Sequence, residues 1–489
     1  MKKFFIIFFL FSSFLLSTMR LEGFYEGQFG RGFDSDAFSW NIWSPNLYFE
    51  NRLYGNPTNN SDYYIKFYSN KDYSESTRPL AVFSEGHIGF REEGENIGFS
   101  STLFTRESRH YWTDGSMLGI VNSGSINNDG NGQGARFDLW HPYKGSMAYV
   151  FSDFSQGDGD DVHLLRIRQS LLKDKLNFGI FFQRKNYSSA KKNDFNQVVA
   201  NDIKLAIGKY YLNSEVAISL VPGDSAITSL TNSYSKAELY KSNIALKSEF
   251  RGFQLGSIST GYWFINPGIF SYGSTFRNYM GDNQYNRYGY WINSHYLVPK
   301  KAITVVLNYS EYQKIVSDSV IVFSNGTLVS KEIFDPTKNL YAEIYIEFIN
   351  GFKGKFSLNK KDEKWQGQSY KHYDLFSELS VENSLAKLLA QFKVKDLGES
   401  WERYVAGIEL SVNLSDKWKI FTRGMIVDDR VGSRFSIFSE LQYRTDGNTE
   451  FYLQYGPSYW GQYGLVHDDG FVSSGNMKKE LKLILKGWF

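Results

Sequence analysis

Residues 434–444 read RFSIFSELQYR, a stretch in which apolar and polar side chains alternate almost one by one. Successive side chains of a β-strand point to opposite faces of its sheet, so this pattern predicts a strand with one apolar and one polar face. The same alternation recurs at residues 342–348, 387–395, 403–414 and 417–426. No stretch sustains helical periodicity long enough to predict a helix. The chain is therefore expected to be all-β.

The connections between the expected strands alternate in length. Short turns are expected at Arg251-Gly252, Pro299-Lys300, Asn350-Gly351, Glu382-Asn383, Ser415-Asp416 and Asp446-Gly447. Asn-Gly and Asp-Gly tolerate the positive φ that tight hairpin turns need. Longer polar loops are expected at 264–286, 313–339, 361–371, 396–402, 428–434 and 457–478. Short turns at one rim and long loops at the other predict an antiparallel meander of about 24 strands, with an even number between about 18 and 26.

Composition excludes several classes of protein. The chain has 489 residues, with 41 Phe, 34 Tyr and 11 Trp, which is far too aromatic for a disordered chain. It has no cysteine, which excludes disulfides and thiolate zinc sites. The 54 Lys and Arg residues nearly balance the 52 Asp and Glu residues, so nucleic acid is not expected as a partner.

The N-terminus has the pattern of an export signal. Lys2 and Lys3 precede an apolar run from Phe4 to Leu16, which is too short to span a bilayer comfortably. We expect residues 1–19 to be a signal peptide and residues 20–489 to form one barrel domain. The alternative is an uncleaved N-terminal anchor.

An amphipathic antiparallel sheet has two common settings. In a soluble sandwich or propeller its apolar face packs on another sheet, whereas in an outer-membrane barrel that face meets lipid and the polar face lines the lumen. Export, strand length, asymmetric connections and an aromatic last strand all favour the barrel. Aromatic side chains also recur near strand ends, where an interfacial girdle would place them, although ordinary packing is the alternative for each ring. These are Trp263, Tyr296, Tyr341, Trp401, Trp418, Tyr443, Tyr455 and Trp488.

The signal segment, the alternating strands, the asymmetric loops and the final stretch Lys482 to Phe489 resemble bacterial outer-membrane β-barrel proteins, broadly porin-like ones. The resemblance implies a closed up-and-down transmembrane barrel with short periplasmic turns and long extracellular loops, surrounded by outer-membrane lipid. It also implies that the barrel-assembly machinery reads the last strand during biogenesis, through Leu485, Gly487 and Phe489. Gly487 departs from the class, which usually has an apolar side chain there. No stretch is left for a separate N-terminal plug, which argues against an energised siderophore transporter.

The polar face of such a barrel is its functional surface. On the expected inner face basic side chains outnumber acidic ones, which predicts a mild preference for anions. The alternative is that these charges pair across neighbouring strands and brace the wall. The candidate lumen-lining residues are Lys241, Lys247, Lys353, Lys355, Lys393, Arg403, Glu409, Lys419, Arg423, Arg434, Glu440 and Arg444.

The stretch 262–296 is the most aromatic part of the chain. Flat rings interleaved with planar hydrogen-bonding groups suit sugar rings, so a saccharide track is a hypothesis, with Trp263, Arg277, Arg287 and Trp291 as its candidates. The alternative is a self-packed loop, extracellular or folded into the lumen as a constriction.

The sequence predicts neither a cofactor, a metal site nor an enzyme. The acidic loop 153–161 lacks the spaced ligands and closing Glu of a calcium loop, and His467-Asp468-Asp469 is similarly weak. No nucleophile motif is present, although hydrolase residues assembled only in space stay open.

We therefore expect an outer-membrane channel for small hydrophilic solutes, with saccharides and anions as candidates. The alternative is a surface adhesin or carbohydrate-binding barrel that acts through its long aromatic loops. A third class is a secreted all-β sandwich or propeller protein.

Overall fold

The computed structural model describes residues 19–33, 46–72, 82–107, 110, 117–121, 133–141, 145–153, 161–186, 195–221, 243–258, 261–273, 276–278, 286–298, 302–324, 327–349, 351–365, 368–430, 432–456 and 479–489. The expected signal segment before Met19 lies outside these residues, as do Lys241, His467-Asp468-Asp469 and the interior of the acidic loop 153–161. Among the described residues, no helix has the length and apolar character needed to cross a membrane.

The described chain is a single sheet of 25 strand segments. β12 and β13 pair with successive parts of β14, so together they take the place of one strand in the barrel wall. We call each such strand position a stave, and the barrel has 24 staves. This confirms the all-β prediction and the expected even strand number. The segments are β1 (Arg20–Phe33), β2 (Asn46–Thr58), β3 (Ser61–Asp72), β4 (Val82–Glu93), β5 (Gly98–Thr105), β6 (Gln133–His141), β7 (Gly145–Asp153), β8 (Asp161–Leu171), β9 (Leu176–Asn186), β10 (Phe195–Ile207), β11 (Tyr210–Leu220), β12 (Ile244–Arg251), β13 (Phe253–Ile258), β14 (Gly261–Tyr272), β15 (Arg287–Val298), β16 (Ile303–Ser324), β17 (Thr327–Ile349), β18 (Phe352–Trp365), β19 (Gln368–Glu382), β20 (Ala386–Lys395), β21 (Arg403–Asn413), β22 (Trp418–Asp429), β23 (Gly432–Arg444), β24 (Thr449–Tyr455) and β25 (Lys479–Trp488).

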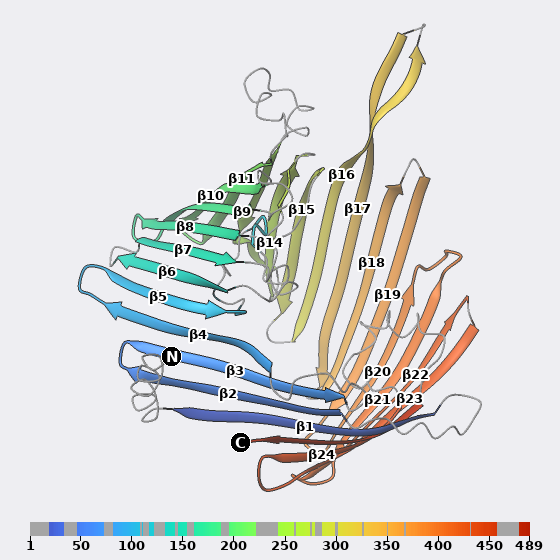
Figure 1. Ribbon diagram of the computed structural model, residues 1–489. Helices are drawn as coiled ribbons and strands as arrows, with labels where there is room; N and C mark the ends of the chain where they lie inside the picture. The colour runs from blue at the N-terminus through green and yellow to red at the C-terminus, as the bar shows by residue number, and fades with distance from the viewer. Residues whose placement is uncertain are drawn as a thin grey trace.

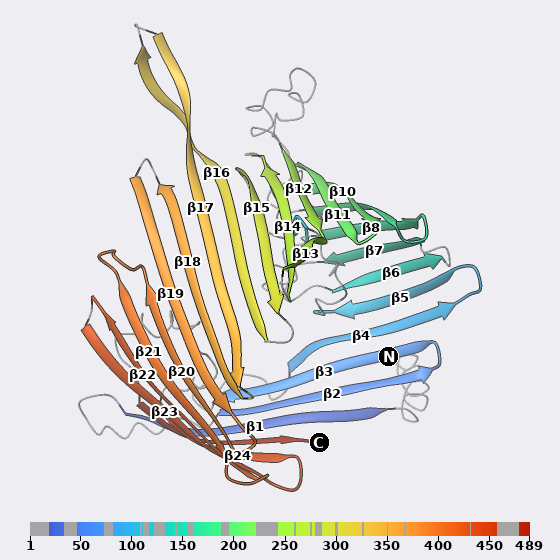
Figure 2. The ribbon, with the colours of Figure 1, turned by 180° about the vertical axis from the view of Figure 1, so that it is seen from behind.

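The sheet closes on itself. Each stave pairs antiparallel with the next along the chain, and β1 pairs with β25, with Phe24 opposite Trp488 (Figures 1 and 2). Closure leaves no unpaired edge in the sheet, which is the condition for a β-structure to cross hydrocarbon. The predicted closed up-and-down transmembrane barrel is confirmed.

The two rims differ as expected. Adjacent staves at one rim are joined by short turns, such as that at 208–209, whereas at the other rim consecutive strand ends are far apart in sequence, as between Leu220 of β11 and Ile244 of β12 and between Tyr455 of β24 and Lys479 of β25. The turn expected at Arg251-Gly252 is wrong. Gly252, with φ of +95°, separates β12 from β13 inside one stave, and the hairpin closes between Ile258 and Gly261. Glycine at positive φ suits an irregularity within a strand as well as a turn, so sequence did not distinguish them.

The loop predicted at 313–339 is also wrong. β16 continues to Ser324 and β17 begins at Thr327, so the two strands form a long hairpin that rises beyond its neighbours (Figures 1 and 2). Strands likewise extend into the loops predicted at 264–286, 361–371 and 428–434. A strand can continue beyond the apolar band, because hydrogen bonds to the neighbouring strands satisfy its backbone groups there as well.

The apolar rows recognised in the sequence lie exposed on one face of the closed sheet, the outer face. Phe435 is 64% exposed, Ile408 60% and Ile426 52%, and the register places all three on the same face. No second layer of described protein covers them, as a sandwich would require. An outward apolar band of this kind is the lipid-facing surface of a membrane barrel. Among the aromatic residues expected in a girdle, Tyr341 and Trp488 belong instead to the opposite, inner face.

Aromatic rings and glycines alternate across the closing seam between β1 and β25. A Cβ atom at Gly23 would lie 1.9 Å from the ring of Phe489, and one at Gly487 would lie 2.1 Å from the ring of Tyr25. Gly23 and Phe489 also exchange two backbone hydrogen bonds, of 2.9 and 3.1 Å. Gly487 therefore departs from the usual apolar residue because Tyr25 from the first strand covers its position.

Candidate functional site

The inner face of the barrel is built differently in two arcs. Over β7–β12, which we call the covered arc, the inner face carries small apolar side chains among buried polar ones, and two segments of the chain pack against it. These segments, residues 117–121 and 276–278, are called the inner layer. Leu118, Ile120 and Phe276 of the inner layer are at most 1% exposed. They join one buried cluster with Phe104, Ala148, Val150, Val162, Leu164, Phe181, Val198, Ala200, Ala217, Ala245 and Tyr272.

Buried polar groups fasten the inner layer to the wall. The backbone N–H of Leu118 donates to Glu215 Oε2 at 3.1 Å, and Glu215 is 2% exposed. Asn278, fully buried, donates to the carbonyl oxygen of Gly119 at 3.1 Å, and so links the two segments of the layer.

Further hydrogen bonds join the second segment to β10 and β11. Asn196 donates to the carbonyl oxygen of Arg277 at 3.1 Å, and the N–H of Arg277 donates to Ser219 Oγ at 3.0 Å. Buried hydrogen bonds of this kind fix position because leaving either partner unsatisfied costs roughly 1–3 kcal/mol.

Over β18–β24, which we call the charged arc, ionic side chains lie beside apolar ones on the inner face. Lys355 Nζ lies 2.9 Å from Glu343 Oε2, and Arg434 Nη2 lies 2.6 Å from Asp429 Oδ2. Arg423 Nε donates to Glu409 Oε2 at 3.1 Å across the β21–β22 pair. The buried apolar cluster of this arc consists, among the described residues, of wall side chains alone: Val405, Met425, Val427 and Phe438, with Phe376 and Phe421 beside them.

The register locates the predicted lumen-lining residues. All of those described lie on the inner face, namely Lys247, Lys353, Lys355, Lys393, Arg403, Glu409, Lys419, Arg423, Arg434, Glu440 and Arg444. Several of their basic groups are ion-paired with carboxylates of the same or neighbouring strands, which favours the alternative that these charges brace the wall. Arg444 and Arg403 make longer pairs, at 3.7 Å to Glu450 and 3.8 Å to Asp429.

The structure separates the residues of the predicted saccharide track. Trp263 is opposite Tyr296 and Trp291 is opposite Gly268, so the continuous register of β14 and β15 places the two tryptophans on opposite faces. Trp263 lies on the outer face and donates its Nε1–H to Ser294. Arg277 belongs to the inner layer, whereas Arg287 and Trp291 face the lumen. Sequence spacing did not reveal this, because the faces depend on how two strands pair.

An aromatic ladder does occupy the inner face of β14–β16. Phe270 lies 6.0 Å from Trp291 and 6.2 Å from Tyr312, measured between ring centroids. Lys247 Nζ lies 5.5 Å from the centre of the Trp291 ring, and the Arg287 guanidinium lies 5.9 Å from that of Tyr312. Cations over aromatic faces stabilise both groups and hold them in place.

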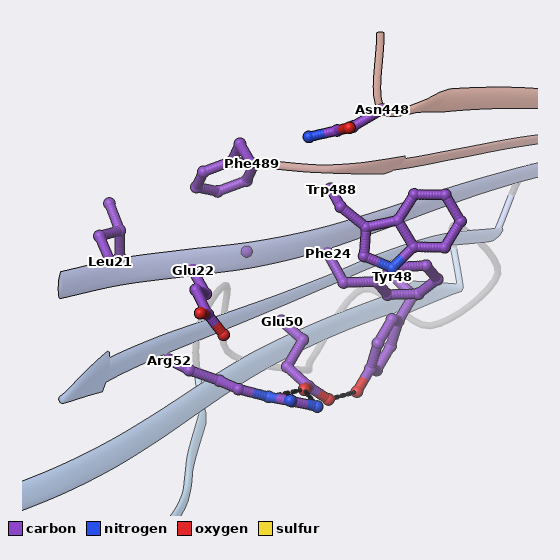
Figure 3. A pocket seen from close by; sticks show the side chains of 10 residues that line it. Leu21, Glu22, Phe24, Tyr48, Glu50, Arg52, Asn448, Trp488 and Phe489 are labelled. Atoms are coloured by element: carbon purple, nitrogen blue, oxygen red, sulfur yellow. Dashed lines mark hydrogen bonds and ion pairs between the residues drawn. The ribbon is translucent and has the colours of Figure 1, made fainter. Parts of the chain in front are cut away.

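A pocket of about 650 Å³ opens at the short-turn rim beside the closing seam (Figure 3). Glu50, 7% exposed, accepts hydrogen bonds from Tyr48 at 2.7 Å and from Arg52 Nε at 2.6 Å, and pairs with Lys66 Nζ at 3.2 Å. Tyr48 and Arg52 lie on β2 with Glu50, whereas the pair with Lys66 joins the carboxylate to β3. The pocket is a feature of barrel closure.

Sequence reasoning missed one cluster of metal-ligand type. His87, Glu107 and His110 bring three potential ligand atoms within 4.8 Å of one another. The only local signal was the pair Glu107 and His110, three residues apart, and that spacing is common by chance. His87 joins them only through strand pairing.

Comparison with known proteins shows a similarity of fold only. Neither the family models nor the curated proteins contain a match to this chain. Among solved structures, the siderophore receptor PirA from Pseudomonas aeruginosa is 9% identical with a TM-score of 0.46, covering 96% of this chain and 80% of that one. The copper transporter OprC is 9% identical with a TM-score of 0.43 and the same coverage. The P pilus usher PapC translocation pore is 10% identical with a TM-score of 0.41, covering 96% of this chain and 99% of that one. Values this low say nothing about activity.

Proposed function

We propose that the chain is an outer-membrane channel or transporter that passes small hydrophilic solutes along the charged arc. The observation that carries this proposal is the asymmetry of the lumen wall. A barrel of 24 staves is wider than the 16–18-stranded barrels that already leave an aqueous channel. The inner layer narrows it on one side only, and the described residues place no segment over the charged arc.

Planar-bilayer conductance of the purified, folded chain tests this proposal. Discrete conductance steps are expected, and they should vanish when the protein is heated before reconstitution. Absence of any step, with a heat-modifiable gel mobility that proves the barrel folded, would contradict the proposal and favour an occluded surface-binding barrel.

The paired charges of this arc fit weak selectivity better than a strong preference for anions. Ion pairs leave a polar, hydrated surface with a reduced net field, because several of the basic groups are offset by a carboxylate nearby. A mild anion preference is the most that we propose, and reversal potentials measured in a salt gradient decide its sign.

A second candidate function is saccharide binding on the aromatic ladder of β14–β16. Sugar rings stack on flat apolar faces, and Trp291, Phe270 and Tyr312 present such faces together on the inner wall. Trp291→Ala should reduce oligosaccharide block of the channel current, whereas Trp263→Ala, on the outer face of the same strand pair, should not. Equal behaviour of the two variants would remove this candidate.

A further inference from the structure

His87 and two residues that follow β5 meet on the inner wall of the barrel, outside the solute path proposed above. His87 lies on β4 opposite Phe104 and Tyr64, on the inner face. Its Nδ1 is 2.9 Å from Glu107 Oε2, and His110 Nε2 contacts the same oxygen. Glu107 is only 2% exposed. A carboxylate is thus buried between two imidazole nitrogens.

Neighbouring groups fix the orientation of these ligands. Asp62 Oδ2 lies 2.8 Å from His87 Nε2. In a neutral His87 ring whose Nε2–H is donated to this carboxylate, the Nδ1 lone pair faces Glu107. The His110 ring stacks on Phe104 with ring centroids 5.2 Å apart, and Arg136 donates to the backbone carbonyl of His110 at 3.3 Å.

This arrangement requires a positive charge at its centre. A neutral imidazole lone pair and a carboxylate oxygen repel each other at hydrogen-bond distance unless a proton or a metal cation lies between them. Protonation of His87 is one solution. A metal ion is the other, and the carboxylate–histidine–metal arrangement of Asp62 and His87 is the usual way in which proteins orient a ligating histidine.

We propose that His87 Nδ1, Glu107 and His110 Nε2 bind a divalent transition-metal ion of the zinc class. Two imidazoles and one carboxylate suit Zn²⁺, and three protein ligands leave one position for water. Metal–ligand bonds of about 2.0–2.1 Å place tetrahedral ligand atoms about 3.3 Å apart, so Glu107 Oε2 has to move about 0.4 Å away from His87 Nδ1 and further than that from His110 Nε2. The site does not depend on the proposed channel function.

Such an ion would cross-link the wall of the barrel to the connection that follows β5. Glu107 and His110 belong to the connection that continues into residues 117–121, whereas His87 belongs to the wall. Metal binding would therefore tie the start of this connection to β4 and stabilise the inner layer, because the ion binds only the folded arrangement.

Metal titration of the full-length chain, folded in detergent micelles and freed of metal with EDTA, tests the proposal. One equivalent of Zn²⁺ should bind in competition with a chromogenic chelator. Co²⁺ should give the intense d–d absorption of a four-coordinate site. Glu107→Gln and His110→Gln should each weaken binding at least tenfold. Asp62→Asn, which leaves all three ligands in place, should weaken it by about 10- to 100-fold.

His372→Gln is the matched control. His372 also lies on the inner face between two carboxylates, 2.6 Å from Asp396 Oδ1 and 3.4 Å from Glu363 Oε1. This substitution should leave the binding constant unchanged. Heat-modifiable gel mobility shows which variants have folded, and Asp62→Asn keeps the test decisive if a ligand variant does not.

Two results would overturn the proposal. The first is a wild-type chain that binds no Zn²⁺ or Co²⁺ at micromolar concentrations, in which case the cluster is a protonated-histidine ion pair. The second is binding that His372→Gln abolishes while Glu107→Gln and Asp62→Asn preserve it, which would move the site to the other histidine.

Discussion

The covered arc and the charged arc belong to one continuous sheet, yet their inner side chains are buried in different ways. Val162 and Ala217 in the covered arc are fully buried because the inner layer packs on them. Arg423 and Glu409 in the charged arc are also nearly buried, at 8% and 13% exposure of their side chains, but by pairing with each other. A wall of small apolar residues leaves room for a second layer of chain, whereas long ionic side chains fill that room themselves.

The sequence predicted a polar inner face, and the two arcs differ in how clearly their strands show it. Alternation of apolar and polar residues is clear in the charged arc. In the covered arc Val, Ala and Leu share the inner face with buried polar groups such as Gln183 and Glu215, so the alternation is less clear there, and part of this face is covered by protein. Outer rows such as Phe151 and Ile167 remain exposed there, at 40% each.

Ala217→Asp should produce the largest effect. Ala217 is fully buried and lies opposite Ala200 and Ala245, so an unpaired carboxylate there should lower the free energy of unfolding by about 3–5 kcal/mol or detach the inner layer. Equilibrium urea unfolding in detergent measures it. The same substitution at Ser411, on the inner face of the charged arc, should cost less than about 0.5 kcal/mol. Equal losses at both positions would mean that the inner layer does not distinguish the arcs.

Arg423→Leu should come next. It removes the partner of Glu409 and should cost roughly 1.5–3 kcal/mol, the range for a hydrogen bond to a charged group. Adding Glu409→Leu should recover most of this loss, because no carboxylate is then left unpaired. A double variant as unstable as the single one would contradict the view that pairing braces the charged arc.

Asn278→Ala should have a smaller effect on stability, about 1 kcal/mol, because it removes neutral hydrogen bonds. Since these bonds link the two segments of the inner layer, hydrogen exchange at residues 117–121 should accelerate and conductance should rise. Asn413→Ala, which removes a 3.4 Å hydrogen bond to Ser384 at the short-turn rim, is the control and should change neither. Unaltered exchange at 117–121 in Asn278→Ala would argue against a role of Asn278 in linking the two segments of the inner layer.

The smallest effect is expected from Lys353→Gln combined with Lys419→Gln. Both lysines lie on the inner face of the charged arc, so their loss should shift the reversal potential slightly toward cation preference. The shift should be larger at 0.1 M than at 1 M salt, because the Debye length falls from about 10 to about 3 Å. Lys360→Gln, on the outer face, should leave the potential unchanged. A shift toward anions would reverse the proposed sign.

The local sequence pattern predicted most of the barrel, because the faces of a strand and the positions of turns depend on residues that are close in sequence. Alternation along residues 434–444 predicted the face of each of these side chains in β23, and β17 and β18 end and begin on either side of the expected turn, at Ile349 and Phe352. Prediction from the local pattern failed where the same sequence feature is compatible with two structures. Gly252 has the positive φ of a turn yet lies inside a stave, and the stretch 313–339, which contains the apolar run 320–323, stays paired as strand.

The sequence by itself determined that the chain is all-β, that its sheet has one lipid-facing surface, and which rim carries the long connections, since two-residue periodicity and turn chemistry act within a few residues. Only the tertiary structure decided that Trp263 and Trp291 face opposite ways, that the inner layer covers one arc, and that His87 meets Glu107. These contacts join residues from different strands, and their geometry is set by register and closure, which no local pattern encodes.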